Sequence, residues 1–171
     1  KERITTAQKT IGERKNTQFI SGDLRNISLG KCSTIVVYDV LHHMLYKDQE
    51  NLIKECYEKL GEDGVLVIKD NDTTPGWKFL WNYLHELITM FLFITKSDKL
   101  NFRTKSGFLE LLFKNGFIVE AVNIPTRLPY PFILYICKKV EKKKADKGII
   151  FVNPPLSLEE RYGAMAKGGR N

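Results

Sequence analysis

The chain alternates short apolar runs with longer segments in which apolar residues recur every three or four positions. The apolar runs predict strands over 34–38, 65–70, 117–124 and 131–139, and the short stretch 17–23, which ends at Gly22-Asp23, is also predicted to be a strand. The helical spacing predicts helices, over 3–13, 48–60 and 105–116, and the aromatic segment 77–94 is also predicted to be helical. Glycines end the helices over 48–60 and 105–116, and the run 61–64 supplies a turn.

This order of elements predicts an α/β fold. Strands that alternate with helices favour an open sheet, and continuous apolar strands are typical of sheets covered on both faces. Only a short turn separates the strands over 117–124 and 131–139. We therefore expect a mostly parallel sheet with an antiparallel pair at its C-terminal edge.

The distribution of charge and the spacing of the cysteines argue against two classes of protein, nucleic-acid binders and disulfide-stabilised domains. The net charge is +7, and the lysine-rich stretch 138–147 contributes +4 of it. No aromatic side chains interleave with these lysines, so the stretch indicates a solvated linker and not a nucleic-acid surface. The three cysteines are far apart and form no CxxC pair. This usage argues against a zinc knuckle or a disulfide framework and fits a protein of the reducing cytoplasm.

The most hydrophobic segment does not predict stable membrane insertion. Lys78, His85 and Glu86 interrupt the stretch 77–94. Its unbroken apolar part is far shorter than the roughly 20 residues that span a bilayer. Trp77, Trp81 and His85 are instead predicted to line an apolar substrate pocket, as a helix that covers the substrate would. A helix packed in the core and a helix on a membrane surface are the alternatives.

Polar residues follow three of the predicted strands. They are Gly22-Asp23, Tyr38-Asp39 with His42-His43 shortly after, and the triplet 70–72. Ligands of open α/β sheets bind beyond the carboxyl ends of the strands, so these groups are expected to converge on one cleft. Each of them, taken singly, also fits a turn or a helix cap.

Three stretches together resemble the middle of a class I S-adenosylmethionine-dependent methyltransferase. They are FISGDLRNISL, TIVVYDVLHHM and ENLIKECYEKLGEDGVLVIKD. The resemblance covers residues 3–139 and implies a Rossmann-like sheet with S-adenosylmethionine as cofactor. The glycine-rich loop of that family and the acid that ends its second strand are not found here. We therefore expect a fragment truncated at the N-terminus, whose strand over 34–38 presents an unpaired edge.

The resemblance also implies roles for individual residues at the cofactor. Asp23 matches the acid that hydrogen-bonds the adenine amino group, and Leu24 matches the residue that lies against the ring. Val37 and Tyr38 match strand positions that line the methionine part, and Asp39, which follows them, is assigned to the cofactor site with them.

His42 and His43 match the positions that face the methyl group and the substrate. We assign them as catalytic, because a neutral histidine can take a proton from a hydroxyl or an amine. Orienting the substrate, packing and helix capping are the alternative roles. The pattern Asp39-x-x-His42-His43 also resembles the E-x-x-E-H metal pattern of coenzyme Q biosynthetic O-methyltransferases. Since a histidine replaces its second carboxylate, no metal is predicted.

The last residues carry a second resemblance. Residues 149–171 begin with an apolar run and Asn-Pro-Pro, which is similar to the start of cobalamin-binding radical S-adenosylmethionine enzymes. This resemblance divides the chain into a partial methyltransferase domain over 1–139, a linker over 140–148 and a tail over 149–171. It implies a fused or neighbouring cobalamin-binding radical domain as a partner.

The predicted function is methyl transfer from S-adenosylmethionine to a small, fairly apolar acceptor, with the acceptor atom left open. A nucleic-acid substrate is not expected, because Tyr38-Asp39 stands where those enzymes carry an Asn/Asp-Pro-Pro-aromatic motif. The alternative is a non-catalytic Rossmann-like scaffold that serves the radical enzyme. A glycine-rich loop encoded upstream of Lys1 would favour the enzyme over the scaffold.

Overall fold

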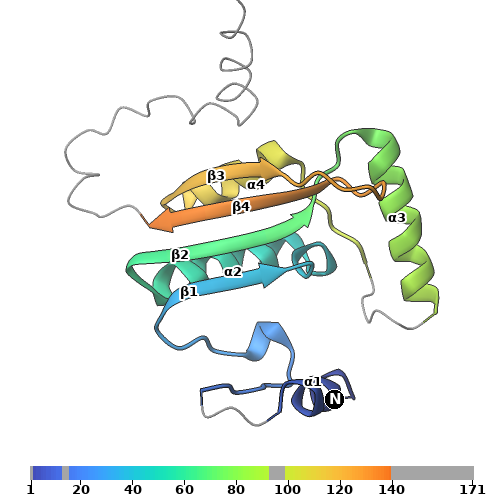
Figure 1. The fold of residues 1–171 in the computed structure, drawn as a ribbon. Helices are drawn as coiled ribbons and strands as arrows, with labels where there is room; N and C mark the ends of the chain where they lie inside the picture. The colour runs from blue at the N-terminus through green and yellow to red at the C-terminus, as the bar shows by residue number, and fades with distance from the viewer. Residues whose placement is uncertain (1, 13–15, 93–98, 140–171) are drawn as a thin grey trace, which may run out of the picture.

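The computed structural model describes residues 2–12, 16–92 and 99–139 (Figure 1). The predicted linker and tail over 140–171 lie outside the described residues. The helices are α1 (Glu2–Ile11), α2 (Tyr46–Lys59), α3 (Gly76–Phe91) and α4 (Lys105–Lys114), with short 3₁₀ turns η1 (Leu24–Asn26) and η2 (Leu41–His43). The strands are β1 (Cys32–Tyr38), β2 (Leu60–Asn71), β3 (Phe117–Asn123) and β4 (Phe132–Lys139).

The four strands form one sheet in the order β1-β2-β4-β3. Strand β1 runs parallel to β2, whereas β4 is antiparallel to both of its neighbours. The predicted fold class is confirmed, including the antiparallel pair at the C-terminal edge. Strand β1 is the other edge, as expected, and the side chain of Tyr38 at its end is 65% exposed.

Helices α2 and α4 cover one face of the sheet (Figure 1). Alternate strand residues point at these helices and form the core, among them Ile68 and Tyr135, which are direct register partners. The expectation of cover on both faces is wrong for the described residues. Val36 and Ile118, on the opposite face, are 64% and 58% exposed. Helices α1 and α3 lie beyond the sheet, α1 past β1 and α3 across the end where β1 and β2 finish (Figure 1).

The predicted strand over 17–23 is wrong. These residues have no strand structure, and Asp23 begins the turn η1. A strand is stable only where a neighbour pairs with its backbone, and no described segment pairs with this one.

The predicted turn over 61–64 is also wrong, because β2 begins at Leu60, directly after α2. The register of β2 with β1 shifts between Cys32 and Thr34, which accommodates the extra residues as an irregularity of the strand. Gly64 is needed there. A Cβ at this position would lie 2.9 Å from the Leu60 side chain and from the Gly61 carbonyl oxygen.

The ends of α4 follow the sequence prediction. The Thr104 hydroxyl accepts a hydrogen bond from the Gly107 amide and caps the first turn. The backbone then turns at Gly116 with a φ of +89°. Among residues 2–12, 16–92 and 99–139, no helix has both the length and the apolar character that crossing a membrane requires.

Candidate functional site

The carboxyl ends of β1 and β2 bring His42 and Asp70 together. His42 Nδ1 lies 2.5 Å from Asp70 Oδ1, and the two side chains are 2% and 3% exposed. A carboxylate only accepts, so Nδ1–H is the donor. Asp70 Oδ1 also accepts from the Asn71 amide, which fixes the carboxylate. The other ring nitrogen of His42, Nε2, is buried and has no hydrogen-bond partner among the described residues.

The surroundings shift the pKa values of His42 and His43 in opposite directions. Burial by itself would lower the pKa of His42, but the hydrogen bond and charge of Asp70, with the charges of Glu86 and Asp39, raise it overall. Burial lowers the pKa of His43, and the neighbouring His42 lowers it further. The pKa of His42 therefore lies above the ordinary histidine value and that of His43 lies below it.

The turn η2, which carries both histidines, is fixed from two sides. Leu41 is fully buried in the core. The side-chain amide of the buried Gln49 donates to the carbonyl oxygens of Leu41, Met44 and Asn101. Arg103 Nε in turn donates to Gln49 Oε1. This network ties η2, the start of α2 and the loop before α4 into one unit, so the histidines have a rigid base.

Helix α3 presents the acid Glu86 to the histidines. Glu86 carboxylate oxygens lie 3.8 Å from Nε2 of His42 and 3.8 Å from Nε2 of His43. The His42 ring also stacks on Phe102, with ring centroids 4.9 Å apart. Phe79 of α3 meets Phe102 edge-on at 5.1 Å. The histidines therefore lie between an acid from α3 and an aromatic wall.

Asp39 does not join the histidines. Both of its carboxylate oxygens lie 2.6 Å from Nζ of Lys69, whose side chain is 4% exposed. Lys69 Nζ also lies 3.3 Å from the centroid of the Phe132 ring. Asp39 has a φ of +48°, a conformation that is uncommon outside glycine. The Asp39 carboxylate is therefore paired with Lys69 and not with a histidine, so the local pattern Asp39-x-x-His42-His43 does not form a metal site.

The residues predicted to hold the adenine lie on η1, against α2. The Asp23 carboxylate accepts from the Arg25 amide and pairs with its guanidinium, with 2.5 Å between Asp23 Oδ2 and the nearest guanidinium nitrogen. These hydrogen bonds lower the pKa of Asp23 to about 2.

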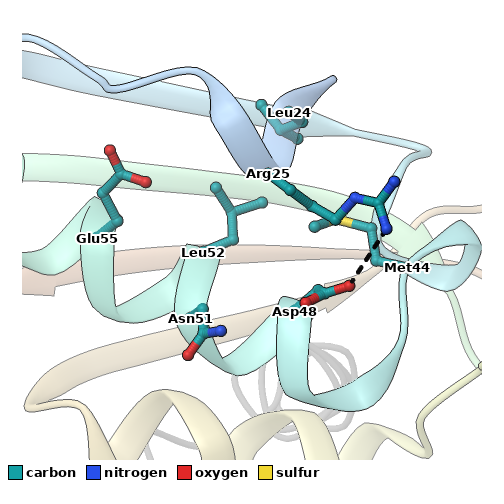
Figure 2. Close-up of a pocket in the computed structure, with 7 residues that line it drawn as sticks. All are labelled: Leu24, Arg25, Met44, Asp48, Asn51, Leu52 and Glu55. Carbon is teal, nitrogen blue, oxygen red and sulfur yellow. Dashed lines mark ion pairs between the residues drawn. The ribbon is translucent and has the colours of Figure 1, made fainter.

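Figure 2 shows a pocket between η1 and α2 that Leu24 lines. At one end of this pocket, the guanidinium of Arg25 lies 4.0 Å from the carboxylate of Asp48. The volume of the pocket is about 80 Å³. Since sites for drug-sized ligands measure about 300–1,000 Å³, the pocket is small for a nucleoside.

The other predicted site residues differ in how far they are buried. Val37 packs in the core, while Tyr38 is exposed at the end of β1. Trp77 and Trp81 are 64% and 54% exposed, and the exposed His85 ring meets Tyr130 with centroids 5.7 Å apart. Their roles remain predictions, because the part of α3 that faces the histidines carries other residues.

The sequence analysis missed three residues of this site. Asp70 was noticed only as one of three polar residues after a strand, and the structure separates their roles. Asp72 accepts from the Lys105 amide and joins β2 to α4, whereas Asp70 holds His42. Glu86 could have been noticed in the sequence, because it is the sole acid of the strongly apolar helix α3. Lys69 could have been noticed as well, because it is a charged residue next to the apolar run of β2.

The comparisons with known proteins agree with the fold. Residues 1–68 match a family model described as a methyltransferase domain. No curated protein matches the chain. The comparisons do not support the resemblance of residues 149–171 to radical S-adenosylmethionine enzymes, nor the partner inferred from it.

Several solved structures share the fold. One is magnesium protoporphyrin IX methyltransferase from Synechocystis PCC 6803 with bound S-adenosylhomocysteine, at 18% identity and a TM-score of 0.56, matching 80% of this chain and 57% of that one. The mitomycin 7-O-methyltransferase MmcR matches at 18% identity and a TM-score of 0.61, over 81% of this chain and 39% of its own. The methyltransferase SibL matches at 13% identity and a TM-score of 0.63, over 82% and 40%.

These three solved structures are longer than the matched region, since the chain spans between 39% and 57% of their length. At such identities the likeness concerns the fold. The described residues therefore have a Rossmann-like sheet of the kind found in these methyltransferases, with the His42–Asp70 pair at the carboxyl ends of its two parallel strands.

Proposed function

We propose that this chain is part of an S-adenosylmethionine-dependent methyltransferase that acts on a small molecule. The observation that carries the proposal is the buried His42–Asp70 pair at the carboxyl ends of β1 and β2, where open α/β sheets bind ligands. The match of residues 1–68 to a methyltransferase domain supports the same function.

The proposed cofactor contacts lie on η1 and at the end of β1. The exposed Asp23 carboxylate is an acceptor for an adenine amino group, and the half-buried Leu24 offers an apolar contact to the ring. Val37, Tyr38 and Asp39 at the end of β1 are the proposed contacts to the methionine part. Both carboxylate oxygens of Asp23 accept hydrogen bonds from Arg25. When the adenine amino group binds, one of these oxygens therefore accepts from Arg25 and from the adenine as well.

S-adenosylmethionine supplies, when bound, a methyl group on a positively charged sulfonium. The task of the protein is then to place an acceptor atom in line with that methyl group and to receive its proton. His42 Nε2 is the proposed proton acceptor, since this ring nitrogen is buried and has no hydrogen-bond partner in the described part of the chain. Asp70 holds the Nδ1–H tautomer and stabilises the imidazolium that forms. His43, whose pKa is lowered, is the proposed second contact to the acceptor.

The acceptor is proposed to be a hydroxyl or an amine on a fairly apolar molecule. The aromatic rings of Phe79 and Phe102 beside His42 support this class, because they offer flat apolar surface at the proton acceptor. Trp77, Trp81 and His85 would contact an acceptor only if its apolar part reaches the outer side of α3.

The test is a calorimetric titration of S-adenosylhomocysteine into the full-length protein. We expect binding, and we expect Asp23→Ala to weaken it about 10-fold, the equivalent of one lost hydrogen bond of about 1.4 kcal/mol. Asp63→Ala is the matched control, because Asp63 is an exposed carboxylate at the start of β2 and should bind as the unmodified protein does.

Absence of S-adenosylhomocysteine binding to the unmodified protein would overturn the proposed function. If Asp23→Ala bound as tightly as Asp63→Ala, the cofactor would be held elsewhere, and the assignment of Asp23 would be lost.

A further inference from the structure

We propose that His42, His43 and Glu86 form a binding site for a divalent transition-metal ion of the Zn²⁺ class. One ligand atom from each residue can be chosen so that the three lie within 4.8 Å of one another. The histidines come from η2 and Glu86 comes from α3, 43 positions after His43, so the cluster exists only in the folded chain.

His42 supplies the second, independent observation. Its side chain is 2% exposed, and Nε2 is buried without a hydrogen-bond partner among residues 2–12, 16–92 and 99–139. A buried polar atom left unpaired is unfavourable, and a metal ion at Nε2 removes that deficit. Glu86 already lies 3.8 Å from this nitrogen, on the side where the ion would be.

Asp70 holds His42 in the way that metal-bound histidines are held. Such a histidine usually donates its other ring N–H to a carboxylate, which fixes the tautomer and the direction of the free nitrogen. The contact between His42 Nδ1 and Asp70 Oδ1 has this arrangement. The ligand that matters most for the site is therefore already oriented.

The distances require a modest closure. In a tetrahedral site with bonds of about 2.1 Å, neighbouring ligand atoms lie about 3.4 Å apart. Glu86 Oε1 lies 3.8 Å from His42 Nε2, Glu86 Oε2 lies 3.8 Å from His43 Nε2, and one atom of each residue can be chosen within 4.8 Å of the other two. The widest separation therefore needs to close by at most about 1.4 Å, which side-chain rotations of Glu86 and His43 supply.

The ligand types select the class of ion. Two imidazole nitrogens and one carboxylate oxygen suit Zn²⁺, Co²⁺ and Ni²⁺, whereas Mg²⁺ and Ca²⁺ prefer oxygen ligands alone. Asp39, the carboxylate nearest in sequence, is bound to Lys69 and is not a ligand. The ion and an acceptor's proton compete for His42 Nε2, so the metal-bound form and the proton-accepting form are alternative states of one site.

The test is a Co²⁺ titration of the full-length protein after treatment with EDTA, without cofactor, followed by visible absorption. We expect one equivalent to bind with the absorption typical of four- or five-coordinate Co²⁺, and Zn²⁺ to displace it. Glu86→Gln should weaken binding at least 10-fold. Asp70→Asn, which leaves all three ligands in place, should weaken it about 10- to 100-fold, as loss of a partner that orients a metal ligand does.

The matched control is His85→Gln. His85 precedes Glu86 on α3, but it is exposed and its ring contacts Tyr130. This variant should bind Co²⁺ as the unmodified protein does. Circular dichroism of each variant separates loss of the site from loss of the fold. The proposal is overturned if the unmodified protein binds no Co²⁺, if a folded Glu86→Gln variant binds it equally well, or if His85→Gln loses as much affinity as Glu86→Gln.

Discussion

Replacement of Asp70 by alanine tests how much the pair with His42 stabilises the fold. Asp70 Oδ1 accepts two hydrogen bonds, from His42 Nδ1 at 2.5 Å and from the Asn71 amide at 2.8 Å. The substitution leaves both donors buried without an acceptor. Each such donor costs about 1–3 kcal/mol. Asp70 Oδ2 is buried without a hydrogen-bond partner among the residues that the structure describes, so its removal offsets part of that cost. We therefore expect Asp70→Ala to lower the free energy of unfolding by about 2–4 kcal/mol.

Asp70→Asn separates the hydrogen bonds from the charge. The asparagine oxygen can accept from both donors, so only the charge-assisted part of the two bonds is lost. We expect a cost of about 1 kcal/mol. Urea unfolding followed by circular dichroism measures both variants, and the midpoints should fall in the order unmodified protein, Asp70→Asn, Asp70→Ala. An Asp70→Ala variant within about 0.5 kcal/mol of the unmodified protein would refute the reasoning, as would equal costs for the two substitutions.

Two further predictions concern other parts of the fold. Gly116→Ala should destabilise by about 1–3 kcal/mol in urea unfolding, because the position has a φ of +89° and a Cβ would lie 3.1 Å from the Tyr57 hydroxyl oxygen. Gly76→Ala, whose Cβ would meet nothing within 4 Å, is the control, and equal losses would contradict this account. Burial raises the pKa of the Cys56 and Cys137 thiols to about 12, so at pH 8 roughly one in ten thousand is a thiolate. Iodoacetamide should therefore modify only Cys32 in the folded protein, as peptide mass mapping would show, and rapid alkylation of the buried pair would contradict their burial.

The pattern of apolar residues was sufficient for the elements that have strong local signals. Helices α2 and α4 and strands β1, β3 and β4 were predicted within a few residues of their observed bounds. The antiparallel edge followed from the short turn between β3 and β4. The strand over 17–23 was not predictable in this way, because strand formation depends on a partner and an apolar run does not reveal one.

For the candidate site, the sequence by itself determined that His42 and His43 follow a buried strand and that polar residues end the next one. It did not determine which of these residues meet. In the tertiary structure His42 is hydrogen-bonded to Asp70 and Asp39 is paired with Lys69. Glu86 lies beside both histidines. These choices depend on which strands become neighbours and on where α3 crosses the end of the sheet. Both are set by contacts between elements far apart in the chain, which the local spacing of residues does not encode.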